Sequence, residues 1–200
     1  MPRRPPRPRR PLRLAVIVAG AVSIVAGNVV AYRHVSLASE PRIPGVQRYS
    51  GLARTHTTRP VVYPQTPPVG GPHAPSPLNC GVYLRPVPAE NAVHSLEHGA
   101  VWVTYRPDLP AGQVRTLRDL VRGKGYLLLS PYPGLPAPVV ASAWGRQLRL
   151  AAASDSRLAG FIDVYRRGPQ TPERGAPCSG GVGDPLWADR TPSRGGHGHR

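Results

Sequence analysis

The segment Val93-His94-Ser95-Leu96-Glu97-His98-Gly99 runs directly into the apolar stretch AVWVTY at residues 100–105. The stretch is rich in β-branched and aromatic residues, which predicts a buried strand. Because Gly99 and this strand follow at once, we expect at most one helical turn before them. Residues i and i+4 of such a turn point to the same side, so His94 and His98 would face one ligand together. The segment therefore predicts a turn with two imidazoles and a carboxylate, joined to a core strand.

Two patterns with a helical period follow this strand. Apolar residues recur at helical spacing in 108–122 and again in 156–167, which predicts two amphipathic helices. Short apolar runs predict strands at 82–84, 126–130, 139–144 and 147–150, the last two as an antiparallel pair. This order is typical of one small α+β domain, with two helices on one face of a mixed or antiparallel sheet.

The first 60 residues have the composition of a membrane anchor with its flanks. Residues 1–13 contain six arginines and no acid, and residues 14–32 form an uncharged run. At about 1.5 Å per residue, a helix over that run spans roughly 28 Å, close to the hydrocarbon thickness of a bilayer. We predict a basic cytoplasmic tail at 1–13, a transmembrane anchor at 14–32 and a linker at 33–60.

This topology places the remaining chain outside the cytoplasm. A cleaved signal peptide is the alternative for residues 14–32, and it leads to the same compartment. An uncleaved anchor makes the protein a single-pass protein of the cell membrane, with the lipid bilayer as its partner.

Proline and glycine dominate residues 61–78, which excludes a helix or an interior strand there. The Val-Val-Tyr start of this segment favours an ordered loop wrapped on the domain. We expect the extracytoplasmic α+β domain to span 61–180. Residues 181–200 are rich in glycine, arginine and histidine, and are predicted to be a disordered tail.

The chain has two cysteines, Cys80 and Cys178. In an oxidising extracytoplasmic space they are expected to form a disulfide. The alternative makes one or both of them thiolate ligands of a metal.

A net charge of +16 raises the question of nucleic-acid binding. The densest basic stretch is the tail before the anchor, which topology explains, and the other arginines are thinly spread. We therefore expect no nucleic-acid partner, whereas an unknown protein of the cell envelope is a possible one.

Several stretches together resemble one bacterial membrane-anchored family, catalogued as domain of unknown function 3105. They are Pro67-Pro68 with Gly71 and His73, Cys80-Gly81-Val82-Tyr83, the VHSLEHG segment, Ala143-Trp144-Gly145-Arg146, and Gly168-Pro169 before the last cysteine. This chain has Gly70 where the family usually has serine, and Gln170 where it usually has glutamate. The resemblance implies one amino-terminal membrane segment and an extracytoplasmic domain, and it brings no established activity.

We interpret the histidines first as a copper or zinc site formed by His73, His94 and His98, with Glu97 assisting. The alternative is a non-enzymatic structural or protein-interaction module, in which Glu97 pairs with Arg85 or Arg106. A second alternative is a metallohydrolase, because His-x-x-Glu-His matches an inverted zinc-peptidase signature. That signature requires a long helix, so the sequence leaves catalysis open and favours its absence. His197 and His199 in the tail are further loose metal ligands at most.

Overall fold

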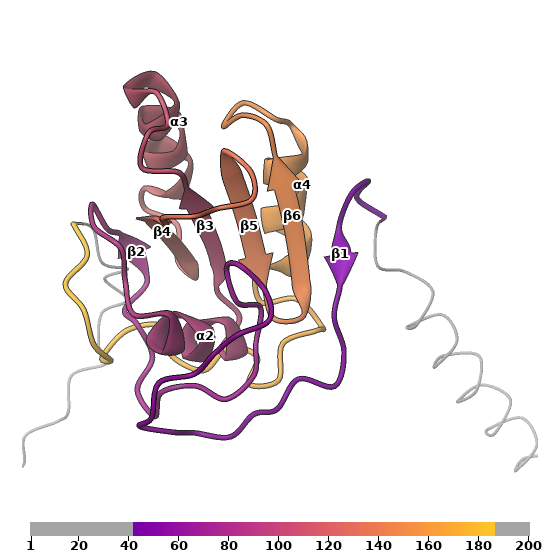
Figure 1. Ribbon diagram of the computed structural model, residues 1–200, viewed down its shortest axis with the longest axis vertical. Helices are drawn as coiled ribbons and strands as arrows, with labels where there is room; N and C mark the ends of the chain where they lie inside the picture. Colours follow the sequence, from indigo (N-terminus) through magenta and orange to yellow (C-terminus); the bar gives the residue numbers. More distant parts are fainter. Residues whose placement is uncertain (1–41, 187–200) are drawn as a thin grey trace, which may run out of the picture. The chain divides into compact units, whose positions relative to one another are not determined.

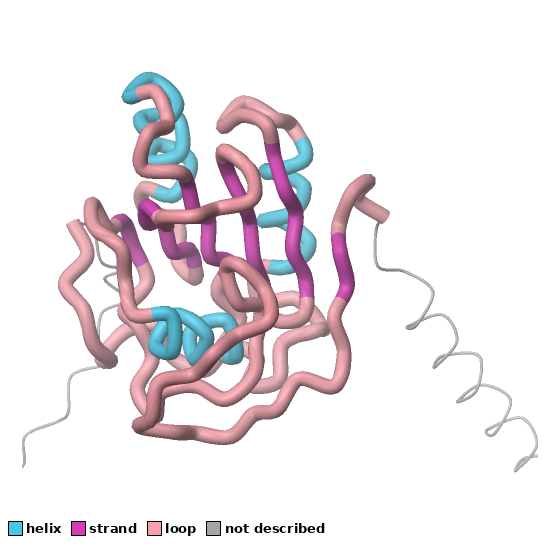
Figure 2. The backbone as a smooth tube through the Cα atoms, viewed as in Figure 1, coloured by secondary structure: helices cyan, strands magenta, loops and turns pink. Residues whose placement is uncertain are grey.

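A computed structural model describes residues 42–186, and these form a six-stranded mixed sheet with three helices (Figures 1 and 2). The strands are β1 (Gln47–Arg48), β2 (Gly81–Val82), β3 (Val101–Tyr105), β4 (Leu127–Pro131), β5 (Val139–Ala143) and β6 (Arg146–Leu150). The helices are α2 (Ala89–Glu97), α3 (Ala111–Val121) and α4 (Arg157–Tyr165). The strand order is β1-β6-β5-β3-β4-β2, in which β4 runs parallel to β2 and β3 and the other pairs are antiparallel.

The side chains of the sheet alternate between two apolar clusters, one on each face. Val101 and Val103 of β3 lie in a cluster with residues of α3 and α4, such as Leu117 and Phe161. Trp102, between the two valines, belongs to the other cluster, which includes residues of α2 and both cysteines. Thus α3 and α4 cover one face, and α2 with its neighbouring loops covers the other (Figure 1).

The predicted α+β class, the core strands and the two predicted helices are confirmed. The apolar stretch at 100–105 is the buried strand β3, and the predicted antiparallel pair is β5 with β6. The two predicted helices are α3 and α4, and their buried residues share one face of the sheet.

The prediction of at most one helical turn before Gly99 was wrong, since α2 has nine residues and is a third helix. It begins directly after Pro88, whose fixed φ suits a helix start, and Glu90 places a carboxylate near the positive end of the helix dipole. Its apolar residues are spaced at i, i+3, i+4 and i+7: Ala89, Ala92, Val93 and Leu96. This spacing is the sequence signal for the helix, and it extends upstream of the two-histidine motif.

The folded domain also extends beyond the predicted limits of 61 and 180. Within the predicted linker 33–60, β1 pairs with β6, and the Tyr49 backbone amide donates to the Gly145 carbonyl. Within the predicted tail, Val182 forms a bridge with Leu78. The predicted anchor at 14–32 lies outside the described residues, and none of the helices in 42–186 has the length and apolar character to cross a membrane.

Candidate metal centre

Three of the four predicted ligands come from the end of α2. His94 and Glu97 lie in the helix, and His98 is its C-cap. Gly99 follows with a φ of +109°, and a Cβ at this position would lie 3.0 Å from the Cα of Arg167. Glycine is needed for both the backbone angle and the close approach. The helix therefore ends at a fixed point, with His98 one turn beyond His94.

The segment 61–78 is an ordered loop on the domain, as predicted, and it brings His73 to the same helix. Six hydrogen bonds join this loop to α2. Two of them involve side chains of the helix, from Val61 N to Glu90 Oε1 (3.1 Å) and from His94 Nδ1 to Ala74 O (2.6 Å). The other four run from Ala74 N to Glu90 O (3.3 Å), from Leu78 N to Asn91 O (3.0 Å), from Asn91 Nδ2 to Ser76 O (2.7 Å) and from Ser95 Oγ to Leu78 O (2.7 Å). The loop is thus tied along the length of the helix, and His73 is fully buried between them.

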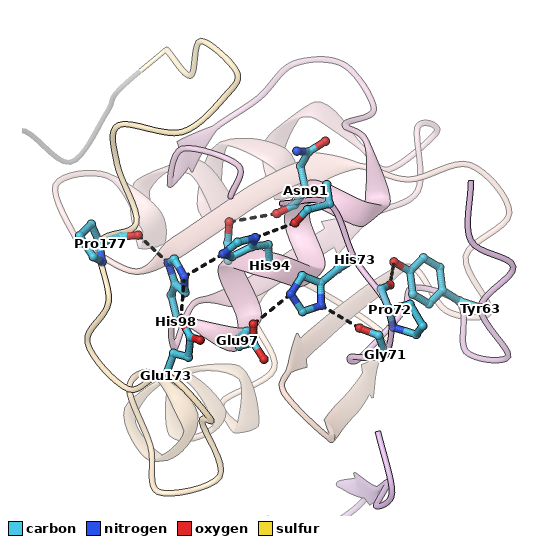
Figure 3. Close-up of polar contacts among 12 residues, drawn as sticks. Tyr63, Gly71, Pro72, His73, Asn91, His94, Glu97, His98, Glu173 and Pro177 are labelled. Atoms are coloured by element: carbon cyan, nitrogen blue, oxygen red, sulfur yellow. Dashed lines mark hydrogen bonds and ion pairs between the residues drawn. The ribbon is translucent and has the colours of Figure 1, made fainter. Parts of the chain in front are cut away.

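All three predicted histidines are oriented in one way, through a backbone carbonyl at Nδ1 (Figure 3). The Nδ1 atoms of His73, His94 and His98 lie 2.8, 2.6 and 2.7 Å from the carbonyl oxygens of Gly71, Ala74 and Pro177, in that order. A carbonyl only accepts, so each Nδ1 carries the hydrogen and donates it. In a neutral ring the lone pair then resides on Nε2. These backbone contacts, which lie outside the cluster, therefore fix the orientation of the three rings and turn their Nε2 atoms toward the cluster.

His73 and Glu97 form a buried pair at the centre of this arrangement. The His73 Nε2 lies 2.9 Å from the Glu97 Oε2, and the two side chains are 0% and 2% exposed. The distance is short, yet His73 Nε2 has no properly aligned hydrogen-bond partner among the described residues. An unpaired buried polar atom costs about 1–3 kcal/mol. A lone pair facing a carboxylate is also repulsive, and a proton or a cation between the two atoms removes both penalties.

His94 and His98 form a second close pair, in which both Nε2 lone pairs face each other when the two rings are neutral and carry their hydrogens on Nδ1. Their Nε2 atoms are 2.9 Å apart, and the ring planes are nearly perpendicular. Desolvation by burial lowers the pKa of His94 below its usual 6.5, and the neighbouring His98, His73 and His56 lower it further, against the opposing effect of the Ala74 carbonyl. His94 is therefore held neutral, with its Nε2 lone pair available to a metal ion.

A fourth histidine, His56, belongs to the cluster and was missed by the sequence analysis. It lies on a segment that pairs in parallel with His73, through Thr57 N to His73 O (2.7 Å) and His73 N to Thr55 O (3.0 Å). One potential ligand atom from each of His56, His73, His94 and Glu97 lies within 4.8 Å of the others. The predicted linker provides this residue, and nothing in its local sequence marks it.

His56 is stacked on His94 and is exposed to solvent, whereas the other three members of the group are buried. The two rings are 4.9 Å apart and only 12° from parallel. A metal ion lies close to the plane of each imidazole ring that binds it. Two rings stacked one above the other, with nearly parallel planes, cannot both direct a lone pair at the same ion. His56 must therefore turn before it can bind the same ion as His94.

A carboxy-terminal strap, residues 173–178, closes the other side of the cluster. The Glu173 and Gly175 amides donate to the Glu97 and His98 carbonyls at 3.0 and 3.1 Å. The strap ends at the disulfide between Cys80 and Cys178, which confirms the predicted pairing and removes both thiols as ligands. Glu97 pairs with His73 rather than with Arg85 or Arg106, so that part of the structural alternative was wrong.

Residues 55–180 match a sequence family described as Protein of unknown function (DUF3105). The chain belongs to this family. The match begins one residue before His56 and ends two residues after Cys178, so the DUF3105 domain contains the whole cluster and the disulfide. Neither the curated proteins nor the solved structures contain a match to this chain.

A cleft of about 410 Å³ lies beside the cluster in the DUF3105 domain. It is lined by Thr57–Pro60, Ala74–Ser76, Glu90, Asn91 and Val182. These residues adjoin His56 and His73 in sequence, but none of the clustered histidines lines the cleft. Glu97 is almost fully buried against His73, and it does not line this cleft either.

Proposed function

We propose that the DUF3105 domain binds one copper or zinc ion in its histidine cluster. His73, His94 and Glu97 are the ligands in this proposal, and His56 or His98 provides a further one. The observation that carries it is the convergence of buried Nε2 lone pairs on one another and on a carboxylate. Such an arrangement is repulsive when empty and favourable around a cation.

The contacts at Nδ1 support this reading. Histidines that bind metals commonly donate the other ring N–H to a backbone carbonyl or a carboxylate, which fixes the ring and raises its basicity. His73, His94 and His98 each have this contact. The 2.9 Å separation of the two Nε2 atoms also fits, because metal–nitrogen bonds of about 2.0–2.1 Å place adjacent ligand atoms roughly 2.9–3.4 Å apart.

The choice of copper or zinc rests on the donor atoms. Imidazole nitrogens with one carboxylate suit Zn²⁺ and Cu²⁺, whereas Cu⁺ prefers thiolate and thioether sulfur. Both cysteines are in the disulfide, and Met1 is the single methionine of the chain, remote in sequence from the cluster. The donor set therefore favours the divalent ions.

We also propose that this domain lies outside the cytoplasm, held at the cell membrane by residues 14–32. The disulfide supports this placement, because disulfides persist in oxidising compartments. A membrane-impermeant maleimide should label a cysteine introduced at exposed Val62 in intact cells, and should not label one introduced within residues 1–13.

Metal content is the direct test. Full-length protein, purified in detergent from an oxidising compartment, is loaded with Cu²⁺ or Zn²⁺, freed of excess metal and measured by elemental analysis. We expect one ion per chain in the wild type and near-complete loss in a His94→Ala/His98→Ala variant. A His197→Ala/His199→Ala variant is the matched control, and it should retain the ion. Equal, negligible metal in the wild type and the cluster variant would refute the proposal.

The second candidate is a structural or protein-interaction module of the cell envelope. The Nδ1 contacts favour it independently, since they also join α2 to the loop and the strap without any ion. Thermal unfolding separates the two functions. An ion at a hundred times its Kd stabilises the folded state by about 2.7 kcal/mol, so Zn²⁺ should raise the melting temperature of a metal site. The module predicts no rise with Zn²⁺ and a lower melting temperature for the cluster variant.

A further inference from the structure

Besides the buried Glu97, a second carboxylate lies at the edge of the cluster, where Glu173 stands beside His98. The Glu173 Oε2 lies 3.4 Å from the His98 Nε2, and the Glu173 side chain is 54% exposed whereas that of His98 is 9% exposed (Figure 3). His98 Nε2 in turn lies 2.9 Å from His94 Nε2. Three potential ligand atoms thus lead from solvent, at Glu173, to the buried His94.

The strap makes this side a fixed part of the structure. The Glu173 amide donates to the Glu97 carbonyl, and His98 Nδ1 donates to the Pro177 carbonyl. The Tyr126 hydroxyl reaches the carbonyls of Gly175 and Ala176, each at 3.0 Å. The disulfide then secures the end of the strap. Glu173 therefore stands beside His98 because its backbone is held there.

His94 connects this side to the buried pair. Its Nδ1 is occupied by the Ala74 carbonyl, so Nε2 is its one free ligand atom. That atom lies close to His98 on one side, and belongs on the other to the group that contains His73 and Glu97. A single lone pair binds one ion at a time, so the two sides cannot both use His94 at once.

We infer that the cluster has two metal positions that share His94: an outer entry position with His98 and Glu173, and an inner position with His73 and Glu97. This inference rests on the proposed function. An ion is captured at the outer position, and His94 passes it inward to the buried ligands. Glu173 matters for capture because residues 33–200, with 20 Lys and Arg against 10 Asp and Glu, have a net charge of +10 that repels cations. An exposed carboxylate at the entrance offsets that repulsion locally. The other exposed member of the cluster, His56, offers an imidazole stacked on His94 and no carboxylate.

The rate of metal uptake tests this route. Full-length protein in detergent is mixed rapidly with the Cu²⁺ aqua ion in a buffer that does not coordinate it, and tryptophan fluorescence is followed. Trp144 is a suitable reporter, because its ring centroid lies 5.9 Å from that of His73 at the inner position. We expect Glu173→Gln to slow uptake about tenfold and to weaken its dependence on salt, with an unchanged endpoint of one ion. Asp163→Asn removes the same charge from an exposed position of α4, and should load like the wild type.

The outcomes separate the entry route from metal binding itself. Uptake by Glu173→Gln at the rate of Asp163→Asn, or two ions held at once by the wild type, would overturn the shared-ligand route. Absence of any ion from the wild type would instead overturn the proposed function. Slow uptake by Glu173→Gln with a normal endpoint supports the route, because a residue with only a structural role would not change the salt dependence of the rate.

Discussion

The two faces of the sheet are held together in different ways. The face covered by α3 and α4 is packed as one continuous apolar cluster. Its helices and strands are close neighbours in the sequence, since β3, α3, β4, β5, β6 and α4 follow one another along the chain. The face covered by α2 is assembled from segments far apart in the chain, and its histidines bond to carbonyls up to 79 residues away. The first face needs only local amphipathic patterns and burial, whereas the second needs cross-links between loops. The candidate metal site lies on the face that depends on those cross-links.

Removal of the disulfide should cause the largest loss of stability, and it should weaken the contacts that hold the α2 face together. Cys80 and Cys178 are 98 residues apart, and closing a loop of that size stabilises the folded state by about 4–5 kcal/mol in the chain-entropy model. We expect Cys80→Ala/Cys178→Ala to lose about that much free energy of unfolding in chemical denaturation without metal. The variant should also bind metal more weakly, because the strap then holds Pro177 and His98 less firmly. A loss below about 1 kcal/mol would mean that the hydrogen bonds of the strap suffice alone.

A cavity in the opposite face should cost slightly less and should leave the metal site unchanged. Phe161 of α4 is fully buried in the apolar cluster, and truncation of such a side chain costs about 3–5 kcal/mol. Phe161→Ala should therefore lower the free energy of unfolding by that amount, while the folded variant still takes up one ion per chain. Val62→Ala is the control, since Val62 is 98% exposed and its truncation should change stability by less than about 0.5 kcal/mol. Loss of metal uptake by folded Phe161→Ala would show that the two faces are coupled.

The same division explains which parts of the fold could be predicted from the sequence. Leu117 and Val121 of α3, and Leu158 and Phe161 of α4, show the helical period of residues that face a core, and the helices formed where this period occurs. By contrast, β1 consists of two exposed polar residues, Gln47 and Arg48. Its only reason to be a strand is its pairing with β6, almost a hundred residues later, which no local pattern encodes.

The candidate site was predictable to the extent that one helical turn contains it. His94, Glu97 and His98 lie within five residues, and the spacing alone indicated that they face together. His73 could be joined to them only through its family resemblance and a guess about the loop. His56 and Glu173 reach the cluster through backbone pairing with His73 and with Glu97, which are contacts that exist only in the folded chain.

The smallest expected effect is a pH dependence of stability that belongs to the α2 face alone. Burial lowers the pKa of His94 in the folded state, whereas the unfolded chain keeps the usual value of 6.5. As the pH falls through 6.5, the unfolded chain takes up a proton that the folded state resists, so stability is complete above this pH and declines below it. The apolar face adds no such slope from histidine, because all four histidines of residues 42–186 lie in the cluster. In metal-free buffer, the free energy of unfolding should fall more for the wild type than for His94→Gln between about pH 8 and about pH 5.5. Parallel curves for the two proteins would mean that the folded state accepts the proton on His94, and that its Nε2 lone pair is less available to a metal than we propose.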